Sequence, residues 1–416
     1  MKMKRIKLPT LVLACFVSLV SMHAWSQTPV MDSEKPRPVP NANTARPVPA
    51  APQLGANSYL LVDFNSGRIL VEHNADMRVE PASITKLMTA YVVFSELDQG
   101  NITLEETVAI SERAWRTGGS RMFIDPSMMV SVEDLIRGMV IQSGNDSSVA
   151  LAEHVAGSEE AFASLMNHYA ELLEMTGTNF MNSTGLPDPD HYTTARDIAI
   201  LSAATVRDFP DYYPWYSEKE FTFNEIRQHN RNTLLWRDPA IDGLKTGHTE
   251  AAGYCLAASA KRDGMRLVSA VMGSSSESSR ASESQTLLNY GFRFYETVQL
   301  YEAGQELATG RVWKGLSEEV TLGLSEPVFV TIPRGRYDDL EAQVQMEPEM
   351  SAPLEAGAVV GSINVQLGDE LIVNRDLVTL SAVEEAGFFG RSWDGMRLWM
   401  NGFFEDEDED EGEDEE

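Results

Sequence analysis

The stretch Pro81-Ala82-Ser83-Ile84-Thr85-Lys86 opens an apolar pattern of helical period that runs from residue 87 to residue 97. Residues three positions apart lie on one face of a helix, so Ser83 and Lys86 place a hydroxyl beside an amine. A serine hydroxyl becomes a good nucleophile when a neighbouring base removes its proton. Lysine is such a base when burial and nearby positive charge lower its pKa toward neutrality. The stretch therefore predicts a nucleophilic serine in the first turn of a helix.

Two further motifs follow along the chain and carry groups that suit the same chemistry. They are Ser143-Gly144-Asn145, after a helical pattern, and Lys245-Thr246-Gly247, on a predicted strand. Ser143 would relay the proton toward the leaving amine, and Lys245 would keep this relay electropositive. Asn145 would donate a hydrogen bond to the substrate amide.

The backbone around the third motif has a predicted role of its own. Gly247 would let the strand approach a peptide closely, and the peptide would add to the sheet as an extra strand. The backbone N–H groups of Ser83 and His248 would form the pair of donors that an oxyanion needs.

The order Ser-x-x-Lys, Ser-x-Asn, Lys-Thr-Gly is the signature of the penicilloyl-serine transferases. The runs 245–249, 253–254, 266–273 and 291–294 extend the similarity. They resemble the low-molecular-mass penicillin-binding proteins that are D-alanyl-D-alanine carboxypeptidases, and the resemblance covers roughly residues 56–404. It implies an α+β fold with a β-lactamase/transpeptidase-like catalytic domain, in which an antiparallel sheet packs with helices. It also implies removal of the terminal D-alanine from peptidoglycan stem peptides, and acylation of Ser83 by β-lactam antibiotics.

The resemblance further implies residues that bind the substrate. Arg231 and Arg280 match family arginines that hold the terminal carboxylate, and Thr246 matches a third contact. A guanidinium pairs with a carboxylate through two parallel hydrogen bonds. One position departs from the family, which often has a histidine where this chain has Thr184.

Hydrophobic alternation predicts strands at 58–64, 68–72, 243–247, 253–260 and 265–272, with helical patterns between the second and the third. Strands at both ends imply one sheet assembled from distant segments and packed with helices. We therefore expect the catalytic domain over residues 58–291. Short strand candidates separated by glycine and proline then predict a small all-β domain over 292–384, in which we find no chemical motif.

The N-terminus has the pattern of a secretory signal peptide over residues 1–26, with basic residues, an apolar run and a small-residue cleavage site. A transmembrane anchor and a lipoprotein cleavage before Cys15 are the alternatives. Residues 27–57 are a proline-rich linker that we expect not to pack. The mature chain would keep one cysteine, Cys255, which we expect to be buried.

The C-terminus predicts attachment to a membrane surface. Residues 385–404 place Phe, Trp and Met on one side of a helical wheel, which is typical of an amphipathic helix that lies in the interface. The acidic tail 405–416 is expected to be solvated. The protein would thus be periplasmic and held on the outer face of the inner membrane. The alternative is that the apolar stripe packs on the β domain.

Composition and motifs argue against several other functions. The net charge of −30 argues against nucleic-acid binding, which usually needs a basic face. No Cys/His cluster indicates a metal, and no cofactor is implied. A class A-like β-lactamase is one alternative function, but the loop 182–196 lacks the glutamate that such an enzyme uses to activate water. A D,D-endopeptidase and a non-catalytic protein of the same fold are the others, and the intact Ser83, Lys86, Ser143 and Lys245 argue against the last.

Overall fold

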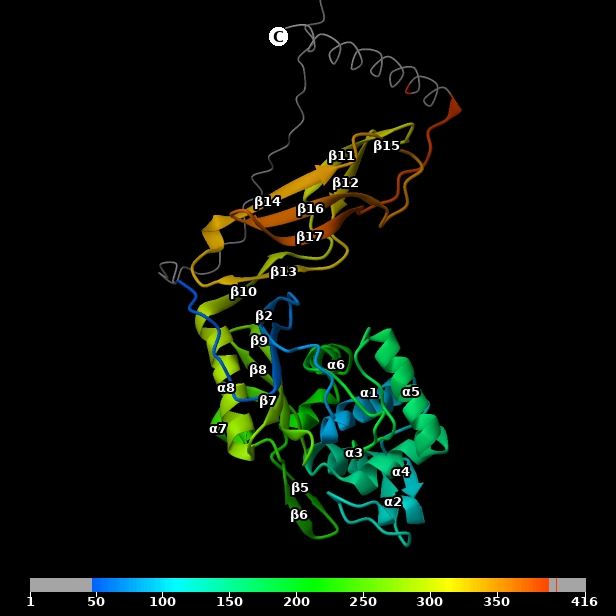
Figure 1. The fold of residues 1–416 in the computed structure, drawn as a ribbon. Coiled ribbons are helices and arrows are strands. Elements are labelled where there is room, and N and C mark those ends of the chain that lie inside the picture. Colours follow the sequence, from blue (N-terminus) through cyan, green and yellow to red (C-terminus); the bar gives the residue numbers. More distant parts are fainter. Residues whose placement is uncertain (1–46, 389–393, 395–416) are drawn as a thin grey trace, which may run out of the picture.

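A computed structural model describes residues 47–388 and residue 394 (Figure 1). The predicted signal peptide, most of the proline-rich linker, nearly all of the predicted C-terminal helix and the acidic tail lie outside the described residues. Within them, no helix is both long and apolar enough to cross a membrane.

The centre of the larger domain is an antiparallel five-stranded sheet with the strand order β2-β1-β9-β8-β7. It joins the two ends of the domain, as predicted, because β1 pairs with β9 over the register Ser58–Met272 to Asp63–Leu267. β7 forms one edge of the sheet. The strands are β1 (Ser58–Asp63), β2 (Ile69–His73), β7 (Ile241–Thr249), β8 (Gly253–Arg262) and β9 (Met265–Ser274).

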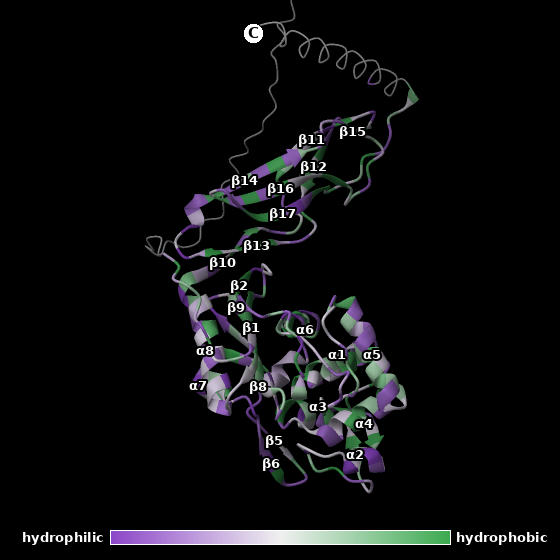
Figure 2. Ribbon diagram, viewed as in Figure 1, coloured by the Kyte–Doolittle hydropathy of each residue, from purple (hydrophilic) through white to green (hydrophobic). Residues whose placement is uncertain are grey.

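Alternate residues of these strands serve two separate cores, because successive side chains of a strand point to opposite faces. Tyr59 and Leu61 join the core beneath α8 (Glu277–Phe294), whereas Leu60 joins the core of the helical region. The helix α8 covers one face of the sheet along β8 and β9 (Figure 1). It carries both hydrophilic and hydrophobic residues, as a helix half exposed to solvent should (Figure 2).

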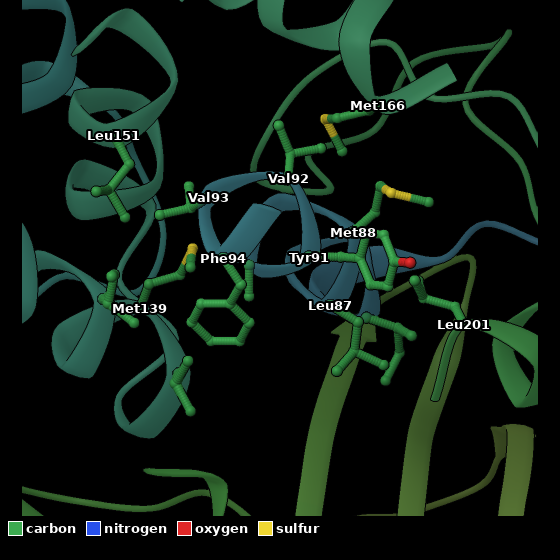
Figure 3. Packing of buried hydrophobic residues seen from close by; sticks show 14 of the residues in the cluster. Leu87, Met88, Tyr91, Val92, Val93, Phe94, Met139, Leu151, Met166 and Leu201 are labelled. Atoms are coloured by element: carbon green, nitrogen blue, oxygen red, sulfur yellow. The ribbon is translucent and has the colours of Figure 1, made fainter. Parts of the chain in front are cut away.

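The helical region is inserted between β2 and β7 and is built around α1. Its residues Leu87 and Phe94 are fully buried, and α1 packs against the four helices α3, α4, α5 and α6 and against the sheet. Figure 3 shows methionine and leucine side chains of the neighbouring helices around the apolar side chains of α1; they are Met139, Leu151, Met166 and Leu201. Burial on all sides explains why α1 lacks a polar face. The elements of the region are η1 (Ala82–Thr85), α1 (Lys86–Asp98), β3 (Thr107–Ala109), α2 (Glu112–Arg116), β4 (Met129–Ser131), α3 (Val132–Ile141), α4 (Asn145–Ala156), α5 (Glu159–Leu172), α6 (Ala195–Asp208), η2 (Tyr213–Ser217), β5 (Glu220–Phe223), β6 (Ile226–His229) and α7 (Leu234–Arg237).

The C-terminal region is all β, as predicted, with its own hydrophobic core. The sheet-packing helix α8 continues to Phe294, and β10 begins at the next residue. One two-stranded sheet pairs β10 with β13, and a six-stranded sheet has the order β14-β16-β17-β12-β11-β15. The elements are β10 (Tyr295–Tyr301), β11 (Ala308–Trp313), β12 (Glu319–Gly323), β13 (Val328–Pro333), η3 (Tyr337–Asp339), β14 (Leu340–Met346), β15 (Met350–Ser351), β16 (Val359–Leu367) and β17 (Glu370–Thr379).

Polar contacts join the two regions at the turn between β1 and β2. The buried Asp63 accepts a hydrogen bond from Thr297 Oγ1 at 2.6 Å, and Arg68 Nη1 donates to Thr331 O at 2.8 Å. Arg68 also pairs with Glu370 at 2.8 Å. The five-stranded sheet is thus in direct contact with the β10–β13 pair.

The expectation that the linker does not pack is wrong for its described part, residues 47–57. Tyr290 on α8 donates to Pro49 O at 2.9 Å, and Asn57 N donates to Met272 O at 3.0 Å. Ala51 and Leu54 pack against the core beneath α8. Apolar side chains between the prolines give this stretch a surface to bury, which proline content alone does not reveal.

Candidate active site

Ser83 lies in a tight turn and not in an α-helix, which corrects the sequence-based expectation. The turn is the 3-10 element η1, and α1 begins only at Lys86. Ala82, directly before the serine, has a φ of +48°, a left-handed conformation that is unfavourable for a residue with a Cβ. A Cβ at Gly185 would lie 1.8 Å from Ala82 O, so the loop that faces the turn fits it with no room for a side chain.

Lys86 is buried and bonded to the serine. Its Nζ donates to Ser83 Oγ at 3.0 Å and to Thr184 O at 2.6 Å. The departure from the family at Thr184 leaves this contact intact, because the acceptor is a backbone carbonyl that any residue supplies. The structure therefore brings the first predicted pair together, with the amine held on the hydroxyl.

The pKa of Lys86 is lowered from its usual 10.5 to about 7, mainly by burial and in part by the positive charge of Arg231. The carboxylates of Asp146 and Glu159 oppose this shift. A pKa of about 7 makes a substantial fraction of the amine neutral near pH 7, and only the neutral amine has a lone pair for a proton. The site thus supplies the base that Ser83 needs.

Ser143 and Lys245 form a second hydroxyl–amine pair. Lys245 Nζ donates to Ser143 Oγ at 2.9 Å and to Thr246 O at 3.2 Å. Ser143 is buried and has a φ of +68°, so a second strained residue stands at the site. Burial lowers the pKa of Lys245 well below its usual value, and the nearby Lys86 adds to the effect. A bound carboxylate would raise this pKa again, because an opposite charge favours the protonated amine.

Asn145 offers an acceptor in addition to the donor that was predicted. Its Nδ2 donates to Gly118 O at 2.6 Å, which fixes the orientation of the amide because a carbonyl accepts only from nitrogen. Its Oδ1 is buried and has no hydrogen-bond partner among the described residues. Oδ1 therefore remains as an acceptor for an N–H of a ligand, while the second N–H of Nδ2 leaves the predicted donor role available.

Asp146 is a residue of the site that the sequence analysis missed. Its buried carboxylate accepts from Met122 N at 3.0 Å, Phe123 N at 2.9 Å and Ile124 N at 3.3 Å. These bonds fasten the loop that crosses Asn145 to the start of α4. Only its place directly after the Ser-Gly-Asn motif could have drawn attention to it.

The third motif reaches Ser83 through its backbone. A Cβ at Gly247 would lie 3.0 Å from Pro81 O and 3.1 Å from Ile84 N, both in the turn that carries the serine. The glycine thus allows strand β7 to approach the turn, and not only a ligand as predicted. His248 follows on the exposed edge of the sheet and stacks on Tyr254, with ring centroids 4.0 Å apart.

The two predicted arginines lie next to each other, close to the Ser143 loop and to strand β7. Arg231 Nε donates to Gln142 O at 3.1 Å, which places it beside the Ser143 loop. The largely buried Arg280 donates to Gly247 O and to Arg231 O, each at 3.4 Å. Burial lowers the pKa of Arg280, but a guanidinium stays charged in proteins. Two cations near the buried Thr246 make a suitable place for a carboxylate.

The fold and this arrangement together define an enzyme that acts through an activated serine, and comparisons with known proteins agree. A family model described as D-alanyl-D-alanine carboxypeptidase matches residues 44–276. A second, described as penicillin-binding protein 5, C-terminal domain, matches residues 295–385. The chain belongs to the D-alanyl-D-alanine carboxypeptidase family of serine hydrolases, which confirms the predicted family, fold class and enzyme class.

Individual relatives extend this similarity over nearly the whole chain. D-alanyl-D-alanine carboxypeptidase DacA of Escherichia coli is 44% identical over 97% of this chain and 98% of its own. The structure of penicillin binding protein 5 from Haemophilus influenzae is 44% identical, has a TM-score of 0.78, and is matched over 81% of this chain and 99% of that one. Penicillin-Binding Protein D2 from Listeria monocytogenes, solved in its ampicillin-bound form, is 29% identical over 57% of this chain and 98% of that one, with a TM-score of 0.54.

Proposed function

We propose that Ser83 is the nucleophile that removes the terminal D-alanine from peptidoglycan stem pentapeptides. Neutral Lys86 takes the Ser83 proton as Oγ attacks the carbonyl carbon of the penultimate residue. The new oxyanion accepts from the backbone N–H groups of Ser83 and His248. The observation that carries this proposal is the 3.0 Å contact between Lys86 Nζ and Ser83 Oγ in a buried site.

The second hydroxyl–amine pair completes the reaction. The C–N bond breaks as a proton passes through Ser143, next to Lys245, to the departing amine of D-alanine. Water then attacks the ester on Ser83, and its acyl–oxygen bond breaks to release the shortened peptide. Lys86, neutral again once its first proton has passed to the leaving amine, takes a proton from this water and delivers it to the serine oxygen. The hydrogen bonds within the two pairs, Lys86 with Ser83 and Lys245 with Ser143, support this proposal.

The carboxylate of the leaving D-alanine would lie between Arg231 and Arg280, with Thr246 as a further contact. The two guanidiniums supply the charge that makes the enzyme a carboxypeptidase, because the site then requires a free C-terminus. Asn145 Oδ1, which has no partner among the described residues, would accept from an N–H of the peptide.

β-Lactams would acylate the same serine. Their cyclic amide opens when attacked, but the amine stays tethered to the acyl group and remains in the site. The test is mass spectrometry after brief exposure to penicillin. One penicilloyl adduct on the peptide that contains Ser83 is expected in the native protein, and none in Ser83→Ala. The matched control, Ser164→Ala on the surface of α5, should be labelled like the native protein. An adduct that persists in Ser83→Ala would refute the assignment.

We also propose that the protein is exported to the periplasm and attached to the inner membrane by residues 385–404. The sequence patterns at both ends support this proposal. The described chain leaves the β domain at residues 385–388, at the end remote from the helical region (Figure 1). Lys314 N donates to the carboxylate of Asp394 at 2.8 Å, and Asp394 belongs to the polar side of the predicted helix.

Vesicle co-sedimentation tests the attachment. The mature protein should pellet with vesicles that contain anionic lipid, and a form ending at residue 384 should stay in solution and remain active. Deletion of the acidic tail 405–416 should tighten attachment, most clearly at low salt, because it removes like charge from the membrane surface. A mature protein that never pellets would leave the packed alternative as the better interpretation.

A further inference from the structure

A cavity of about 460 Å³ opens beside the proposed carboxylate site. It is lined by Phe123, Gln142, residues 226–231 and Glu277, and we call it the Arg231 pocket. Its walls come from the loop that Asp146 holds, from strand β6 and from the start of α8. None of the steps above uses it.

The pocket lies on the leaving-group side of the reaction. Ser143 Oγ accepts from Lys245 Nζ, and the residue before it, Gln142, accepts from Arg231 Nε through its carbonyl at 3.1 Å. Gln142 and Arg231 both line the pocket. The cavity therefore adjoins the loop that carries Ser143, on the side of Arg231. A substrate whose carboxylate lies on Arg231 has only the side chain of its terminal residue left to extend there.

The charges around the pocket are already balanced once a carboxylate is bound. Arg227 forms an ion pair with Glu220, and Arg280 pairs with Glu277 Oε1 at 3.4 Å. Arg231 and the terminal carboxylate then balance each other. An additional anion on the leaving residue would therefore meet no unpaired cation among these groups.

Two acceptors remain at the pocket. Gln228 donates through Nε2 to Arg121 O at 2.9 Å, whereas its Oε1 is buried and has no partner among the described residues. A buried acceptor without a donor is unfavourable, so a ligand that brings an N–H is favoured there. The contact of Glu277 with Arg280 uses one of its two carboxylate oxygens. Both groups favour an occupant with an amine or an amide.

The rim of the pocket is apolar. Phe123 has a φ of +70°, and its side chain stays about half exposed. Its N–H donates to the buried carboxylate of Asp146, which holds the residue in this unfavourable conformation. Ile226, on the opposite wall, is also exposed. Two apolar side chains at the entrance would pack on the methylene groups of a long side chain.

We propose that the Arg231 pocket is a subsite for the side chain of the leaving D-residue, selective for a long side chain that ends in an amine or an amide. The inference rests on the proposed function, because it requires the terminal carboxylate to lie on Arg231. The leaving residue with such a side chain would have one of two sources. It is either a D-amino acid at the end of an uncross-linked stem peptide or the diamino acid through which a second stem peptide is cross-linked.

Peptides that differ only in the leaving residue test this subsite. We would compare N-acyl-L-Lys-D-Ala-D-X with X as Ala, Leu or Lys, because all three form the same acyl-enzyme and differ only in acylation. The D-Lys peptide is expected to have a kcat/KM at least fivefold higher than the D-Leu peptide. Glu277→Gln should lower that ratio at least threefold. A purified cross-linked dimer in the same assay shows whether the diamino acid of a cross-link is accepted.

A variant that fills the pocket gives a sharper test of the subsite. Ile226→Trp should lower the ratio of kcat/KM for D-Lys to that for D-Ala at least tenfold. The matched control is Leu172→Trp, at an exposed position of α5, which should leave the ratio unchanged. Equal values for D-Lys and D-Leu, or a ratio that Ile226→Trp does not change, would overturn the subsite. If the D-Ala peptide itself is not cleaved, the proposed function fails and not the subsite alone.

Discussion

Replacing Lys86 by methionine should inactivate the enzyme and yet stabilise it at neutral pH. The folded state holds the pKa of Lys86 at about 7, below its usual 10.5, because the amine is buried. Between these two values the unfolded chain binds more protons than the folded one, so stability rises with pH. Burial of the ammonium therefore destabilises the fold most below pH 7, and the effect disappears as pH approaches 10.5.

The size of the effect follows from the two pKa values. Relative to a neutral side chain, the lysine costs about 4 kcal/mol at pH 7 and about 2 kcal/mol at pH 9. Methionine avoids this term but leaves Thr184 O without the amine that now lies 2.6 Å away. A buried acceptor left unsatisfied costs about 1–3 kcal/mol. The variant should thus be the more stable form at pH 7, and its advantage should shrink by about 2 kcal/mol at pH 9.

The assay is urea unfolding at pH 7 and pH 9, followed by tryptophan fluorescence. The difference between the native protein and the variant removes the contribution of other titrating groups, except that loss of Lys86 also relieves Lys245. The relief of Lys245 would also stabilise the variant at pH 7. Lys219→Met, at an exposed position, is the matched control and should change stability by less than about 0.5 kcal/mol. A variant less stable at pH 7, or an advantage independent of pH, would refute a buried and largely deprotonated amine.

Four further results are expected. Penicillin acylation should rise with pH through about 7, because only neutral Lys86 accepts the proton, and Lys86→Arg should abolish it. Lys245→Arg should keep part of the activity because this residue supplies charge, and equal activity of the two arginine variants in a peptide-release assay would contradict that division. Arg280→Ala should impair peptides with a free C-terminus far more than amidated ones, by roughly 1.5–3 kcal/mol of transition-state binding, and an equal loss on both would place the arginine elsewhere. Gly119→Ala should slow acylation measured with a fluorescent penicillin, because the added Cβ would lie 2.5 Å from Asn145 Nδ2 in a residue with a φ of +87°, whereas unchanged labelling would show that this contact yields freely.

The sequence alone was enough to identify the chemistry and the domain architecture. Three short motifs in a fixed order name the side chains that the reaction needs, and alternation of apolar residues locates the strands at both ends of the catalytic sheet. These features are local or depend on order along the chain, so they are visible without coordinates. The confirmed family and fold class followed from them.

The environment of those side chains was decided only by the tertiary structure. Lys86 has a pKa of about 7 because the loop at Thr184, the strand at Gly247 and helix α4 close around it, and burial is a property of packing and not of spacing. Asn145 offers an acceptor because the carbonyl of Gly118 fixes the orientation of its amide. Asp146 had no sequence pattern to mark it, since its partners are backbone N–H groups more than twenty residues away. Hydrogen bonds to the backbone leave no trace in side-chain identity, so the sequence determined which groups react and the fold determined their protonation and polarity.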